Sequence, residues 1–157
     1  MLRNFPSPND VYRVRAPKNF YAAMRADVEL LLENQRYLAL TTVIMCCLDA
    51  LAADPGDTRR RGKFGSFMKK HFPDLCTLLD PVCPGRKGTD VLYDKFRNGF
   101  AHNRGPKSNF VIVEDHEVEG DWAGRFPDLD GKPVGINVDR LAKEFLKLLD
   151  QLEHGRR

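Results

Sequence analysis

Apolar residues recur at helical spacing in the first third of the chain. In the stretch NFYAAMRADVELLLENQRY, apolar side chains lie three or four positions apart, at Phe20, Met24, Val28, Leu31 and Leu32. Pro17 suits the first turn of such a helix. The next stretch, residues 37–53, is strongly apolar, which predicts a second helix at the buried centre of a bundle.

The rest of the chain predicts shorter helices, two strands and one long terminal helix. Residues 63–71 and residues 73–79 have the pattern of short helices, and Thr89 or Asp90 can cap a further helix. The segments NFVIVEDHEVE and KPVGINV have the composition of strands. The last segment, RLAKEFLKLLDQLEH, predicts a helix that Asp139 caps, with an apolar stripe at Leu141, Phe145, Leu148, Leu149 and Leu152.

These elements predict a mainly α fold, namely a helical bundle with a small β-hairpin or sheet inserted before the last helix. A chain of 157 residues is long enough for one domain with an apolar core, so we expect a single domain over residues 1–157. Residues 1–16 contain two prolines and predict an extended N-terminal arm. Residues 108–138 hold the predicted β insertion.

Composition places the chain among ordinary globular proteins, with 42% hydrophobic and 30% charged residues. The most apolar stretch, LALTTVIMCCLDALAA, is too short to cross a bilayer and is interrupted by Asp49, so we expect no membrane segment. The N-terminus lacks the apolar centre of a secretory signal, which predicts a cytoplasmic protein. The four cysteines show no C-x2-C pair, which favours buried or half-buried free thiols over a zinc site.

The net charge of +3 is unevenly distributed along the chain. Thr58–His71 and Arg86–Lys107 are basic, whereas residues 114–130 are acidic. A basic zone suits phosphate binding, although such runs are also typical of a solvated surface. If RNA binds, the candidate contacts are Arg59, Arg60, Arg61, Lys63 and Arg104, the first three of them in a loop that can follow a nucleic-acid backbone.

Other polar groups support weaker hypotheses. Lys69, Lys70 and His71 can contact phosphates or simply form a solvated helix face. The acidic residues from Glu114 to Asp121 would alternate between the two faces of a strand, which favours an exposed hairpin edge over a metal site. Asp49 is either a functional acid in an apolar helix or a solvated residue where that helix emerges, and we favour the second interpretation.

The run RNGFAH, residues 97–102, holds the most specific candidate chemistry. On an α-helix, one face holds Leu92, Phe96, Gly99 and Phe100, which predicts the core side. Arg97 lies about 140° around the axis from His102, so one helix does not bring the two side chains together. Two copies of the helix packed across a two-fold axis could place both groups around one cleft, which makes a homodimer the natural active form.

RNGFAH resembles the R-x4-6-H motif of HEPN domains (higher eukaryotes and prokaryotes nucleotide-binding), in which a polar residue commonly follows the arginine. The match by motif covers residues 90–104, and the expected strands after it depart from the plainest HEPN bundle. The resemblance implies a bundle that dimerises through its motif helices and, in many members, a metal-independent endoribonuclease. No cofactor and no metal are then needed. Catalysis would fall to Arg97, Asn98 and His102, in a toxin or a defence factor.

Two alternatives stay open. The chain can be a non-catalytic HEPN-like dimer that binds a nucleotide, RNA or a protein partner such as an antitoxin. It can also be an unrelated helical interaction domain. In either case Arg97 can pair with Asp94 three residues earlier, and His102 can act as a cation at a helix C-terminus. No phosphate-binding glycine loop or nucleophile elbow points to another enzyme class.

Overall fold

The computed structural model describes residues 20–53, 60–81, 85–99, 110–125 and 134–154. The predicted N-terminal arm, residues 1–16, lies outside the described residues. Within them the protein is mainly helical with a small sheet before the last helix, as predicted, but the sheet has three strands rather than the two expected.

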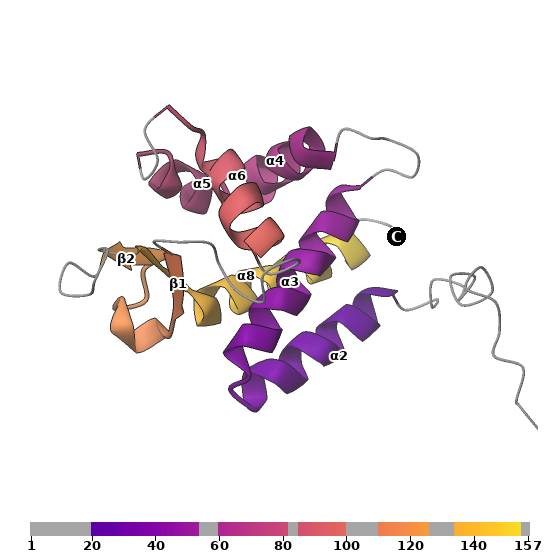
Figure 1. The fold of residues 1–157 in the computed structure, drawn as a ribbon. Coiled ribbons are helices and arrows are strands. Elements are labelled where there is room, and N and C mark those ends of the chain that lie inside the picture. The colour runs from indigo at the N-terminus through magenta and orange to yellow at the C-terminus, as the bar shows by residue number, and fades with distance from the viewer. Residues whose placement is uncertain (1–19, 54–59, 82–84, 100–109, 126–133, 155–157) are drawn as a thin grey trace, which may run out of the picture.

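Three long helices form the main layer of the bundle. Helix α2 (Phe20–Glu33) turns back into α3 (Tyr37–Ala52) through a tight link in which Gln35 has a φ of 52°. The last helix, α8 (Val138–His154), packs against both of them, and Figure 1 shows it behind α3. The predicted apolar stripes are confirmed in part. Buried members are Met24, Val28, Leu141, Phe145, Leu148 and Leu149, whereas Leu31, Leu32 and Leu152 are half-buried and Phe20 is exposed.

A second group of helices packs against α3. It consists of α4 (Arg60–His71), α5 (Pro73–Leu79) and α6 (Gly88–Val91), which form the upper part of Figure 1. Pro73 opens α5, where its missing N–H costs nothing. Helix α6 continues without a break into a π-helical turn, Leu92–Arg97, and helical backbone reaches Gly99.

Gly88 fixes how closely α6 approaches α5. A Cβ atom at Gly88 would lie 2.0 Å from the carbonyl oxygen of Cys76, so only glycine fits there. The backbone N–H of Gly88 donates to Oδ1 of Asp80 at 2.6 Å. The expected caps at Thr89 or Asp90 are wrong, because Lys87 precedes the first helical residue and makes no side-chain cap.

The sheet has the order β1-β3-β2. Strand β1 (Phe110–Val113) pairs in parallel with β3 (Val134–Asn137), and β2 (Ala123–Arg125) pairs antiparallel with β3. The strand expected over NFVIVEDHEVE ends at Val113, so it does not include the acidic residues that follow. Asp115–Glu117 forms a 3-10 turn instead, because the side chains of Glu114 and Glu117 make a capping box with the local backbone.

Asn137 joins the sheet to α8. It is fully buried, and its Oδ1 accepts the N–H of Arg140 at 2.9 Å in the geometry of a helix N-cap. Its Nδ2 donates to Asp115 Oδ1 and to the carbonyl of Asp121, each at 2.9 Å. The cap predicted at Asp139 is therefore wrong, since Asp139 lies within the first turn and its carboxylate accepts the N–H of Asp115.

No helix in the described part of the chain has both the length and the apolar character needed to cross a bilayer.

Candidate functional site

Arg97 ends the π-helical turn and reaches across to the middle helix of the bundle. Its Nη2 donates to Oδ2 of Asp49 on α3 at 2.7 Å, although 48 residues separate the two in sequence. The side chains are only 18% and 16% exposed, respectively. The prediction that Asp49 is a solvated residue at the emerging end of its helix is wrong. Asp49 is a half-buried partner of the motif arginine.

Two neighbours on the motif helix complete the environment of the guanidinium. Nη1 of Arg97 donates to Oδ1 of Asn98 at 2.8 Å, so the two adjacent motif residues contact each other. The carbon at the centre of the guanidinium lies 5.4 Å from the centroid of the Tyr93 ring, within the range of a cation–π contact. These two contacts and the bond to Asp49 together restrict the orientation of the Arg97 side chain.

The helix carries Arg97 to this position through its widened turn. The N–H of Asn98 donates to the carbonyl of Tyr93, five residues earlier, rather than to the residue four earlier. Leu92 and Phe96 remain fully buried, and Gly99 is buried as well, so the predicted core face is confirmed over these residues. Phe100, also expected on that face, lies outside the described residues.

The electrostatics of the pair favour the charged form of the arginine. Burial by itself lowers the pKa of Arg97, but the hydrogen bond and negative charge of Asp49 outweigh it and raise that pKa. The alternative pairing of Arg97 with Asp94 is wrong, because Asp94 forms its ion pair with Arg86. Arg86 and Arg97 are thus paired with different carboxylates.

The other candidate residues are distributed as follows. His102, Arg104 and Arg59 lie outside the described residues. Arg60 and Arg61 begin helix α4 rather than standing in a loop, and their side chains lie outside the described part of the structure. Lys63 lies in the same helix and is half-buried. The described structure therefore brings together Arg97 and Asn98 among the predicted site residues.

Sequence reasoning undervalued Asp49 as a partner of Arg97. The available signal was an acid in an otherwise apolar helix, which favours a partner of opposite charge.

The cysteines of the described residues differ in exposure. Cys46, one turn before Asp49, is exposed, whereas Cys47 is half-buried and Cys76 is buried. Among the described residues, no group of three or more histidine, cysteine, aspartate or glutamate side chains is arranged to hold a metal ion.

Comparison with known proteins leaves the site to be judged on its own geometry. No protein-family model, no curated protein and no solved structure matches the chain.

Proposed function

We propose that the chain is a metal-independent endoribonuclease of the HEPN type, acting as a homodimer through Arg97, Asn98 and His102. The observation that carries the proposal is the fixed, half-buried guanidinium of Arg97, which Asp49 orients and Asn98 contacts. A catalytic arginine needs such preorganisation, because a donor that is already in position loses no free energy to reorganisation during the reaction.

The chemistry needs proton transfer and charge stabilisation but no cofactor. The 2′-hydroxyl of the RNA attacks the adjacent phosphorus, its proton passes to a base, and the 5′-oxygen of the next nucleotide leaves with a proton. Histidine is the side chain suited to proton transfer near neutral pH, so His102 would serve as base and then as acid. The products would be a 2′,3′-cyclic phosphate and a 5′-hydroxyl end.

Arg97 would stabilise the negative charge that builds up on the phosphate oxygens. A guanidinium has five N–H donors, and its bonds to the described side chains of Asp49 and Asn98 use two of them. The remaining donors suit phosphate oxygens in the geometry typical of arginine. Asp49 would be a positioning residue, because it touches Arg97 rather than the substrate.

The proposal is tested by incubating a mixed RNA pool with the protein in the presence of EDTA. We expect cleavage with cyclic phosphate ends by the wild type and its loss in Arg97→Ala and in His102→Ala. Lys147→Ala is the matched control, since Lys147 is an exposed cation on α8. Retained cleavage in Arg97→Ala would exclude this site. No cleavage by a folded wild-type dimer would favour the binding-module alternative.

Mixing two inactive variants tests the dimeric site. If Arg97 of one protomer works with His102 of the other, a dimer of one Arg97→Ala and one His102→Ala protomer keeps one complete site. Random exchange makes half of the dimers mixed, so activity should recover to about a quarter of the wild-type value. No recovery after proven exchange would exclude a site that needs only Arg97 of one protomer and His102 of the other.

A further inference from the structure

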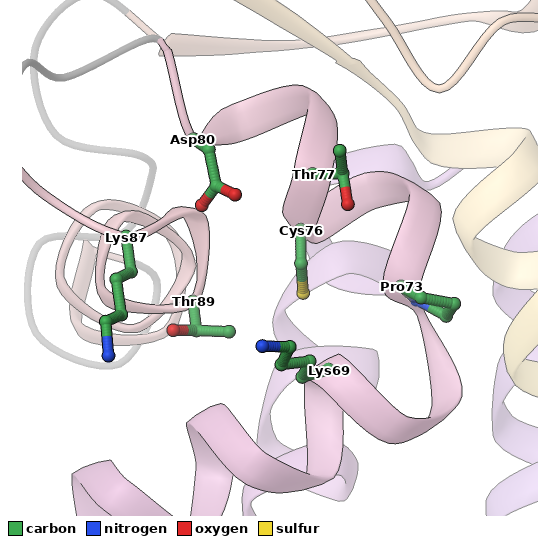
Figure 2. A pocket seen from close by; sticks show the side chains of 7 residues that line it. All are labelled: Lys69, Pro73, Cys76, Thr77, Asp80, Lys87 and Thr89. Atoms are coloured by element: carbon green, nitrogen blue, oxygen red, sulfur yellow. The ribbon is translucent and has the colours of Figure 1, made fainter.

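A pocket of about 280 Å³ lies apart from Arg97, where α4, α5 and the start of α6 meet. Its lining includes Lys69 from the last turn of α4, Cys76 and Thr77 from α5, and Lys87 and Thr89 around the start of α6. Figure 2 shows these side chains arranged around the hollow. The volume is just below the roughly 300–1,000 Å³ typical of pockets for drug-sized molecules, so the pocket suits a small ligand.

The walls of the pocket are held by close backbone contacts. Gly88 touches the carbonyl of Cys76 so closely that no side chain fits between α5 and α6. Asp80 ties the same junction, because its Oδ1 accepts the N–H of Gly88 at 2.6 Å. A ligand therefore meets preformed walls, which reduces the ordering cost of binding.

The polar groups of the lining divide by charge. In Figure 2 the ammonium groups of Lys69 and Lys87 lie on one side of the hollow with the hydroxyl of Thr89 between them in this view. The Asp80 carboxylate lies toward the opposite side. Two cations against one anion leave a net positive lining, and both lysines are exposed enough to approach a ligand from solvent.

We propose that this pocket binds the phosphate group of a small phosphate ester, no larger than a sugar phosphate. Lysine binds phosphate as a point charge, and Lys69, Lys87 and the Thr89 hydroxyl of the same lining can serve separate oxygens of one tetrahedral group. Asp80 on the far side can accept a hydroxyl of the sugar, since carboxylates accept several hydrogen bonds. The proposal does not depend on RNA cleavage at Arg97.

Cys76 belongs to the pocket as a packing residue and not as a nucleophile. Burial, with a smaller contribution from Asp80, raises the pKa of its thiol to about 11. It therefore stays protonated at neutral pH, and the thiol is the unreactive form. Non-covalent binding is what this lining supports.

Calorimetric titration with ribose 5-phosphate and with inorganic phosphate tests the proposal. We expect saturable binding of both, and a loss of affinity of about tenfold or more in Lys69→Gln and in Lys87→Gln. Lys70→Gln is the matched control, because Lys70 carries the same charge on the next residue of α4 but does not line the pocket. Thr89→Val keeps the shape of the side chain and should also weaken binding.

Each contrary result would overturn the proposal. Equal losses in Lys70→Gln and Lys69→Gln would show general attraction to a basic surface. Equal affinity for a small dicarboxylate would show that the pocket does not select phosphate. Binding of an RNA oligonucleotide without binding of either small phosphate would assign these lysines to a nucleic-acid surface. If the folded wild type shows no saturable binding at ligand concentrations well above ~1 mM, the site is excluded.

Discussion

Removing the carboxylate of Asp49 should leave Arg97 charged and without its partner in a half-buried setting. Truncating one member of a buried pair typically costs about 3–5 kcal/mol, whereas exposed pairs contribute about 0–1 kcal/mol. With side chains 16% and 18% exposed, the Asp49–Arg97 pair lies between these limits. We therefore expect Asp49→Ala to lower the free energy of unfolding by about 2–3 kcal/mol.

A second ion pair of the same length provides the control. Lys147 Nζ and Glu144 Oε1 are 2.7 Å apart, as are the closest atoms of Arg97 and Asp49, but their side chains are 65% and 36% exposed. Glu144→Ala should cost at most about 0.5 kcal/mol, because water screens this pair and both side chains lose entropy in forming it. The comparison separates burial from distance as the cause of the effect.

Urea unfolding of Asp49→Ala, Arg97→Ala and the double variant measures the interaction directly. We expect a coupling of about 1–3 kcal/mol, with the double variant less destabilised than the sum of the two single variants. For a chain of this size, the loss in Asp49→Ala corresponds to a fall in Tm of about 4–12 °C. Single effects that add to within about 0.5 kcal/mol would refute the claim that the two side chains act as a pair.

Three further predictions follow from single contacts. Gly88→Ala should lower the free energy of unfolding by about 1–3 kcal/mol, because the new Cβ forces α5 and α6 apart. Gly62→Ala should raise it by about 0.5–1 kcal/mol, because a Cβ there meets nothing within 4 Å and alanine favours the helix. Thermal melts that rank the two variants in reverse would contradict this. In alkylation at pH 8, exposed Cys46 should react well before Cys76, whose thiol has a pKa of about 11, and equal rates would refute the buried placement. Burial, and to a smaller extent Lys70, lower the pKa of His71, so the unfolded chain binds a proton at this residue more readily than the folded protein does. The free energy of unfolding should therefore fall as pH drops below about 6.5. In urea titrations, His71→Gln should remove that part of the pH dependence.

The sequence was sufficient to predict the long helices because each has an apolar face that must be buried. Phe20–Glu33, Tyr37–Ala52 and Val138–His154 lie close to their expected positions for this reason. The strands β1 and β3 were also expected, since both are short apolar runs before a polar turn or a helix. Helices and strands with a clear apolar pattern can therefore be predicted from the sequence without knowledge of the tertiary contacts.

Elements that depend on contacts or on local hydrogen bonds were harder to predict. The acidic segment alternates like a strand, but the capping box of Glu114 and Glu117 stabilises a 3-10 turn instead. Strand β2, Ala123–Arg125, contains a glycine and only three residues, and it is ordered by pairing with β3. The partner of Arg97 was out of reach for a similar reason, because a helix pattern does not show which helix lies opposite.

The π-helical turn gives the physical reason why Arg97 meets Asp49. In a regular α-helix Arg97 would lie about 140° around the axis from Leu92, well away from the buried face. When the N–H groups bond five residues back instead of four, each residue advances by a smaller angle. Arg97 then comes round toward the buried side of the turn that holds Leu92, and its guanidinium reaches Asp49 on α3, a helix that packs against this turn. A geometry with a constant 100° per residue therefore misplaces the motif arginine. The wide turn and the half-buried ion pair are best understood as one feature, since a charge left without its partner at that depth costs free energy.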